Sequence, residues 1–248
     1  MMRRYVADLH VHTVLSPCAA VEMTPRNIIR HAADAGIDIV AVTDHNAGDN
    51  VPAALAAAVG TGVTVLPGME VETREEVHLV VLFDRLTAFR QWQRLVEANL
   101  PPLVNDEARL GAQFVVDAED NLLEVKQRML LTSLKMGIAE VVTAANALGG
   151  LCIAAHIDRP AYSILSQLGF VPDDLPLAAV EVSSRVTLQE ARTRFPQAGN
   201  LPFVTASDAH TIDDFLCGAK TIFLIAQPTL AEIRQALYGQ NLRKVVMV

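Results

Sequence analysis

TPRNIIRHAADAGIDIVAVTDH, residues 24–45, predicts a helix that is followed directly by a buried strand. Thr24 before Pro25 is typical of a helix start, and Gly36 is typical of a helix end. The β-branched run Ile37–Thr43 then predicts a strand, which stops at Asp44-His45. A helix joined closely to a strand that is apolar throughout is the repeating unit of a parallel sheet covered by helices.

The same alternation extends along most of the chain and predicts seven or eight strands. Besides Ile37–Thr43, the expected strands are Tyr5–Leu9, Val63–Leu66, Leu151–Ala155, Ala178–Val182, Phe203–Thr205 and Thr221–Ile225. A helix is expected at Val51–Val59, and Thr229 should cap the last one. We therefore expect an α/β barrel that forms a single domain over residues 1–248.

The stretch Pro101–Val125 fits this alternation poorly. It contains Pro101-Pro102 and a turn-rich segment, Asp117–Asn121, that predicts a hairpin. We interpret it as an insertion into the barrel, and expect it to influence substrate choice at the mouth of the site.

Composition limits the class of protein. With 51% hydrophobic and 19% charged residues, the 248-residue chain should fold around its own core. The net charge of -8 and the lack of a Lys/Arg run argue against binding long nucleic acid, although a small anionic substrate remains compatible. Three cysteines are too few for a disulfide framework, and neither a signal peptide nor a membrane span is visible, so a cytoplasmic protein is expected. The sequence does not indicate an oligomeric state.

The placement of the histidines is the most informative feature. Six of the seven lie at the end of an apolar run or within a short strand: His10, His12, His45, His78, His156 and His210. In α/β barrels the carboxyl ends of the strands converge on one face, where active sites are built. His10 and His12 are two residues apart on a strand, so both rings should point to the same side. The sequence therefore predicts one cluster in space.

Carboxylates accompany these histidines. Glu70 and Glu72 share a face of a short strand; Glu70 is the better candidate for bridging two cations, and Glu72 could be a solvated charge at the rim. Asp208 and His210 can also share a face. We expect Asp44 to support a ligand or to cap the next turn rather than to bind metal itself.

Other interpretations are weaker. A single histidine of this kind is more often a hydrogen-bonded core residue, but six together make that reading improbable. No Gly-x-Ser-x-Gly elbow or glycine-rich phosphate loop is present, which argues against a serine hydrolase or a nucleotide cradle.

The ordered motifs DLHVHT at 8–13, TDH at 43–45, GME at 68–70 and SDAH at 207–210, together with His78 and His156, resemble those of the PHP family, named for polymerase-associated and histidinol phosphatase members. The resemblance spans Asp8 to His210. It implies a distorted (β/α)7 barrel of the PHP type that holds two or three divalent metal ions, zinc, manganese or iron, and hydrolyses phosphate esters.

The resemblance also implies a distribution of ligands. The first ion would be held by His10, His12, Glu70 and Asp208; the second by Glu70, His78 and His156; the third in part by His45 and His210. The sequence departs from many members at Leu15–Cys18. Cys18 stands where some members place a histidine of the third site, and is either a thiolate ligand or a buried structural cysteine.

Metal ions of this kind supply hydroxide at neutral pH and neutralise phosphoryl oxygens. We take His210, His45 and Asp208 as the catalytic residues, with His210, His45 or a metal-bound water as the proton donor to the leaving group. Arg159 and Arg185 follow strands of the expected barrel and are candidates for binding the phosphate, although surface salt bridges are an equal alternative.

The sequence therefore favours a phosphoesterase acting on a small phosphomonoester or a short nucleotide. The alternatives are a 5'-3' exonuclease, an amidohydrolase that cleaves C–N bonds, and a non-catalytic metal-binding module. Lys126 and Lys135 are poorly placed to serve as the carbamylated lysine of an amidohydrolase. Eroded ligands would mark the non-catalytic module, and apart from the segment of Cys18 the ligands are intact.

Overall fold

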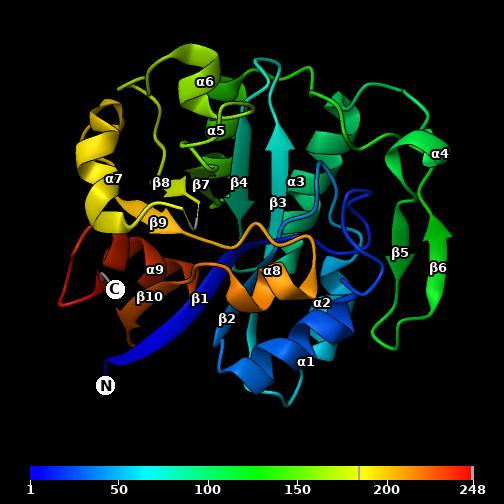
Figure 1. Cartoon of the computed structure of the whole chain (residues 1–248), viewed down its shortest axis with the longest axis horizontal. Coiled ribbons are helices and arrows are strands. Elements are labelled where there is room, and N and C mark those ends of the chain that lie inside the picture. The colour runs from blue at the N-terminus through cyan, green and yellow to red at the C-terminus, as the bar shows by residue number, and fades with distance from the viewer. Residues whose placement is uncertain (184, 247–248) are drawn as a thin grey trace.

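The structure, a computed structural model, describes residues 1–183 and 185–246, and one large mixed sheet forms its centre (Figure 1). The strand order is β11-β10-β1-β2-β3-β4-β7-β8-β9. These strands are β1 (Arg3–Val11), β2 (Ile39–Val42), β3 (Thr64–Glu72), β4 (His78–Leu82), β7 (Leu151–Ala154), β8 (Ala179–Val182), β9 (Phe203–Thr205), β10 (Thr221–Ile225) and β11 (Lys244–Val246).

Seven of these strands, from β1 through β9, curl into a nearly closed barrel. The chain that leaves β9 returns to the end of β1, where Val11 forms a parallel bridge with Ala209 and the backbone N–H of His12 donates to the carbonyl of Ala209 at 3.1 Å. β10 and β11 continue the sheet on the other side of β1. The expected α/β barrel is thus confirmed.

The sheet is mixed, whereas the sequence pattern predicted parallel strands. β1, β2 and β3 are parallel to one another, as are β7, β8 and β9, but β4 is antiparallel to both its neighbours and β10 is antiparallel to β1. The link between β3 and β4 is too short for a crossover, so the two strands can only form a hairpin. The hairpin pairs Glu72 with His78, which brings the beginning of β4 to the edge where β3 ends.

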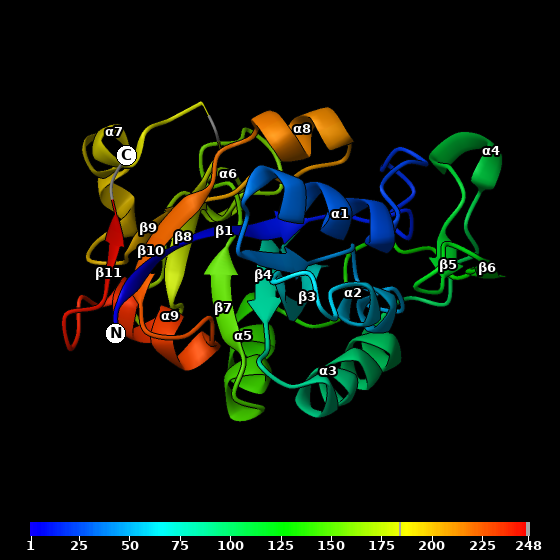
Figure 2. The ribbon, with the colours of Figure 1, turned by 90° about the horizontal axis from the view of Figure 1, so that it is seen from below.

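Helices cover the outside of the barrel, as Figure 2 shows for α1, α2, α3 and α5. The helices are α1 (Pro25–Ala35), α2 (Val51–Ala57), α3 (Leu86–Asn99), α4 (Glu107–Leu110), α5 (Ile138–Ala147), α6 (Ile164–Leu168), α7 (Leu188–Arg194), α8 (Ile212–Cys217) and α9 (Leu230–Leu237), with a 3-10 turn at Pro196–Ala198. α1 begins and ends as predicted: Thr24 Oγ1 accepts the N–H of Asn27, and Gly36 has φ 71°. No helix in the described residues has the length and apolar character needed to cross a membrane.

Apolar side chains fill the barrel interior at the end that α9 covers. Alternate residues of all seven strands, such as Leu9 and Ile153, form a buried cluster together with apolar residues of α9. α9 is fixed at this end because the backbone N–H of Leu230 donates to Asp84, just after β4, and Arg234 donates to the carbonyl of Gly150, just before β7. The opposite end, where the parallel strands finish, is therefore left for polar side chains.

The inserted segment Pro101–Val125 contains α4 and a two-stranded hairpin of β5 (Phe114–Val116) and β6 (Leu122–Val125). Asp117 and Asn121 close the hairpin turn, as predicted. Both views place this unit at one edge of the molecule (Figure 1, Figure 2).

Candidate metal centre

Polar side chains from six separate segments meet at the end of the barrel opposite α9. They are the residues that the sequence singled out: His10 in β1, His12 just after it, His45 after β2, Glu70 in β3, His78 at the start of β4, His156 after β7, and Asp208 and His210 after β9. His78 joins the cluster from the first residue of a strand because β4 runs antiparallel. His31, the remaining histidine, lies on α1.

Glu70 stands at the centre of the cluster. Its carboxylate is 1% exposed and lies within 3.4 Å of ring nitrogens of five histidines. The shortest of these separations is 2.8 Å, to Nδ1 of His78. Gly68, two residues earlier in β3, lets the strand lie close to the end of β2. A Cβ at Gly68 would lie 2.8 Å from the Thr43 side chain and 3.0 Å from the Val42 carbonyl. One carboxylate thus faces more imidazoles than it could bind as hydrogen-bond donors.

His10, His12, Glu70 and Asp208 fit a single divalent cation. Nε2 of His10 lies 3.3 Å from both carboxylates, and Nε2 of His12 lies 3.0 Å from Asp208 and 3.4 Å from Glu70. Yet both Nε2 atoms and Oδ1 of Asp208 are buried without a hydrogen-bond partner among the described residues. Two atoms that each lie about 2.0–2.1 Å from one cation are about 3.0–3.4 Å apart. The donor set therefore fits a metal ion better than a hydrogen-bonded network.

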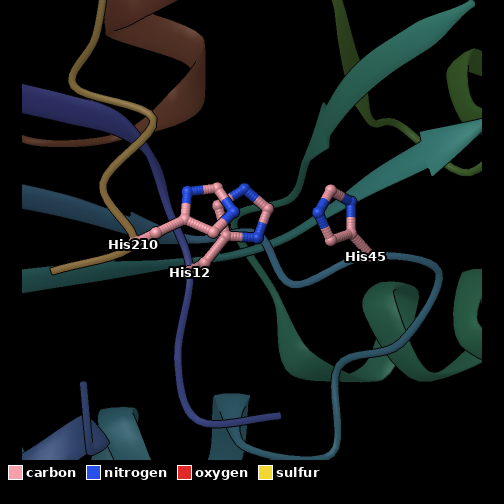
Figure 3. Close-up of side chains that lie close together, drawn as sticks. All are labelled: His12, His45 and His210. Atoms are coloured by element: carbon pink, nitrogen blue, oxygen red, sulfur yellow. The ribbon is translucent and has the colours of Figure 1, made fainter. Parts of the chain in front are cut away.

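Two further groups adjoin the first and share residues with it. His45, Glu70 and His78 have ligand atoms close enough for one ion, and so do His12, His45 and His210. Figure 3 shows the second of these groups, with the rings of His12 and His210 against each other and His45 beside them. The ring centroid of His12 is 4.2 Å from that of His210 and 4.5 Å from that of His45. His156 reaches Glu70 through Nε2 at 3.2 Å.

Cys18 lies beside the last of these groups. It is exposed, which rules out the expectation of a buried structural cysteine. Partial desolvation raises the pKa of its thiol, but the neighbouring His210 and His45 outweigh this and lower the pKa to about 6. A thiolate at neutral pH is a soft metal ligand.

Hydrogen bonds behind the cluster fix the tautomers of His10 and His12. A carboxylate can only accept, so Nδ1 of His10, 3.1 Å from Glu181, carries the proton. Nδ1 of His12 lies 3.0 Å from the hydroxyl of Ser16, which donates to Asp44 at 2.7 Å. When neutral, both rings therefore turn an unprotonated Nε2 toward Glu70 and Asp208. This agrees with the expectation that Asp44 supports a ligand.

Glu181 is a member of the site that sequence reasoning missed. It is 1% exposed in β8, and it accepts from the backbone N–H of His156 as well as from His10. A lone acid inside the apolar run Ala178–Val182 was the available signal, because an ionised side chain in a buried strand needs a partner.

Asp8 holds the loop that carries Asp208. Its carboxylate is fully buried, accepts the backbone N–H of Ser207 at 3.1 Å and lies 3.0 Å from Nζ of Lys220. Lys220 also donates to the carbonyls at the end of α8. Asp8, the first residue of the motif DLHVHT, thus positions Ser207, the first residue of the motif SDAH.

Backbone strain is concentrated here. Asn46, His156, Tyr162 and Asp208 are non-glycine residues with φ between 29° and 57°. Such conformations cost roughly 1–3 kcal/mol each and persist where surrounding contacts enforce them, often at functional sites.

The carboxylates of the cluster remain ionised despite their burial. Burial raises the pKa of Glu70, but His78, His10 and His45 lower it well below its usual range. Asp208 behaves in the same way, chiefly because of His10 and His12. For His10 the signs are opposite: burial lowers the pKa of the imidazole, but Glu181, Asp208 and Glu70 raise it well above its usual value. For His12, burial and the neighbouring His210 and His45 lower the pKa.

Two clefts open beside the cluster. The arginine cleft, about 550 Å³, is lined by Arg159, Arg185 and Arg194 together with Asp158, Pro160, Ser183, Val186, Ser207, Asp208, His210 and Asp214. The tyrosine cleft, about 310 Å³, is lined by Tyr162 and by His45, Glu70, His78, His156, Arg159, Pro160, Ala161, Asp208 and His210. The structure thus places both predicted arginines at the site and adds Arg194. Neither lining includes a residue of Pro101–Val125, contrary to the expectation that this insertion shapes the mouth.

The two clefts meet at Arg159, Pro160, Asp208 and His210. Nη2 of Arg159 lies 2.6 Å from Oδ2 of Asp208. Arg185 and Arg194 form no ion pair with the residues that the structure describes. Two guanidinium groups therefore remain available to an anion.

Comparison with known proteins adds independent information. The model of the PHP domain family matches residues 8–182. A 5'-3' exoribonuclease of Haemophilus influenzae is 25% identical over the whole of this chain and 75% of its own length. A lesion-specific endonuclease of Pyrococcus furiosus superposes with a TM-score of 0.68 at 20% identity, over 98% of this chain and 58% of that one. An amidohydrolase of Chromobacterium violaceum superposes with a TM-score of 0.60 at 17% identity, over 97% of each chain. The likenesses to solved structures concern the fold, and the chain spans little more than half of the endonuclease.

Proposed function

The chain belongs to the PHP family of metal-dependent phosphoesterases, and from this premise we propose that it hydrolyses a small phosphomonoester or a short nucleotide at a centre of two or three divalent cations. That the chain is a metal-dependent hydrolase follows from the family. The observation that supports a centre of more than one cation is the contact of one buried carboxylate, Glu70, with five imidazoles. A carboxylate so surrounded is suited to bridge two cations.

We assign the first ion to His10, His12, Glu70 and Asp208, the second to Glu70, His78 and His156, and a third to His45 and His210, with zinc, manganese or iron as the metal. The distances within the first set support that assignment. His45 can share an ion with Glu70 and His78 as well as with His12 and His210, and its Nδ1 is 3.0 Å from Glu70. It could therefore serve either ion.

The protein's own groups have distinct tasks in this scheme. Bound cations would supply hydroxide at neutral pH and neutralise charge on the phosphoryl oxygens. Arg159 and Arg185, together with Arg194, would hold phosphate oxygens in bidentate fashion. With a third ion on His45 and His210, a metal-bound water would donate the proton to the leaving group. Where that ion is not bound, His210 is a candidate donor: its Nδ1 donates to the carbonyl of Asp208 at 2.9 Å, which leaves Nε2 for the substrate. His45 is the other candidate, and Asp208 acts as a ligand.

A 5'-3' exonuclease is the second candidate. The likeness to the Haemophilus exoribonuclease favours it, and the arginine cleft could follow a nucleotide chain away from the metals. An amidohydrolase is less well supported: Nζ of Lys126 pairs with Asp49 at 2.7 Å, so this lysine is not placed to become a carbamylated ligand.

The proposal is tested by hydrolysis of an aryl phosphate and of a short 5'-phosphorylated RNA, before and after chelation and after adding back manganese or zinc. We expect chelation to abolish hydrolysis and added metal to restore it. We expect His10→Ala and Asp208→Ala to lack hydrolysis even after metal is added. Preference for the RNA would select the exonuclease. Full activity of both variants, or cleavage of amides alone, would exclude the phosphoesterase.

The role of Cys18 is tested separately, by loading the protein with Co²⁺. If Cys18 is a ligand of the third ion, the spectrum should contain an intense sulfur-to-cobalt charge-transfer band, and Cys18→Ser should remove the band and about one cobalt per chain. An unchanged spectrum and cobalt content in Cys18→Ser would show that the thiol is no ligand. Cys217→Ser is the matched control, because Cys217 is also exposed and lies at the end of α8.

A further inference from the structure

Tyr162 is an aromatic side chain exposed at the edge of the metal cluster. Its residue is 45% exposed although it lines the tyrosine cleft together with His78 and Arg159. Its ring is stacked on that of His78, with centroids 4.8 Å apart and an interplanar angle of 22°. One face of the tyrosine thus covers a candidate ligand, and the exposed part of the ring borders the cleft.

The backbone holds this ring in place at a cost. Tyr162 has φ 57°, which L side chains rarely adopt. The conformation is enforced from both sides, since the carbonyl of Tyr162 accepts the N–H of His78 at 2.8 Å and the adjacent Ser163 caps α6 while donating to the carbonyl of Arg159. Backbone strain that is enforced in this way clusters at active sites and ligand-binding residues.

We propose that Tyr162 is a stacking platform for a nucleobase and so makes the enzyme selective for nucleotides over other phosphate esters. The inference rests on the proposed function, because it places the phosphate of the same substrate at the metals and Arg159. Arg159 lines both clefts and reaches Asp208, so a phosphate beside it can carry a nucleoside whose base lies over the tyrosine. Stacking on an aromatic ring tolerates any base, because every base has a π-face.

The test compares adenosine 5'-monophosphate with ribose 5-phosphate, which has the same phosphate and sugar but no base. In the metal-loaded wild type we expect the lower KM for the nucleotide. Tyr162→Leu should raise KM for the nucleotide about tenfold, leaving kcat and the KM for ribose 5-phosphate within about twofold. Tyr162→Phe should behave like the wild type, since it keeps the ring and an L side chain at the same φ.

Equal losses for both substrates in Tyr162→Leu would show that Tyr162 only shields His78 and would overturn the inference, as would unchanged kinetics. If the wild type hydrolyses neither compound, the proposed function is decided by the aryl phosphate and the RNA alone. The platform is then judged by equilibrium dialysis of the same two compounds: tighter binding of the nucleotide that Tyr162→Leu abolishes supports it, and equal binding refutes it.

Discussion

Replacing Glu70 by glutamine is expected to lower kcat for an aryl phosphate by at least about a thousandfold. The glutamine keeps the size of the side chain but loses its charge and one of two oxygens. Five imidazoles, including those of His10, His45 and His78, would lose the anion that now faces them. Because two proposed ions share this carboxylate, elemental analysis should show at least one ion fewer per chain.

Glu72→Gln is the matched control for this experiment. Glu72 lies two residues further along β3, is only partly buried, and its closest approach to a ligand is 3.7 Å, to Nε2 of His78. We expect its substitution to reduce kcat less than about tenfold, because at 3.7 Å it is too far from His78 for the hydrogen bond whose loss typically costs about 10–100-fold. If Glu70→Gln retains its metal and loses no more activity than Glu72→Gln, Glu70 does not bridge two ions.

Much of the site could be predicted because ligands at strand ends leave a local mark. In Ile37–His45 and Leu151–His156, an apolar run stops abruptly at a histidine, and the barrel brings such ends together. The insertion and the caps of α1 were also visible, since proline, glycine and threonine act within a few residues.

What the sequence could not show depends on pairing between distant segments. The reversal of β4 follows from the short link at 73–77, but its consequence for His78 requires the register with Glu72. Glu181 meets His10 across 171 residues, and Tyr162 lies over His78 only because of a strained turn after β7. No local periodicity encodes these contacts.

The second large effect concerns the response of stability to pH, which should reverse in sign when metal is removed. Without metal, four histidines, His10, His45, His78 and His210, have pKa values raised above their ordinary value, because carboxylates and, for His45 and His210, Cys18 outweigh burial. Among the histidines only His12 is shifted the other way, and the lowered pKa of the Cys18 thiol offsets one of the four raised imidazoles. The folded chelated protein therefore binds more protons near neutral pH than the unfolded chain, whose histidines titrate at about 6.5. Its stability is fully present below about pH 6.5 and falls as pH rises through the raised values.

Metal changes the sign because cation binding requires neutral imidazoles and so releases protons. The loaded protein should become more stable as pH rises over the same window. One site at a hundred times its Kd contributes about 2.7 kcal/mol. Two sites should then raise Tm by about 10 °C or more near pH 8, since 1 kcal/mol corresponds to about 2–4 °C in a chain of this size.

Thermal unfolding followed by circular dichroism between about pH 6 and pH 8.5, with EDTA or with manganese, measures both slopes. Opposite slopes require that the same imidazoles pair with carboxylates when protonated and bind cations when neutral. His31→Gln, which alters the histidine on α1, should keep both slopes, whereas Glu70→Gln should flatten both because it removes the charge on which each depends. Parallel slopes with and without metal would mean that the cations bind away from the cluster, and the assignment of Glu70 and its histidines would fall with them.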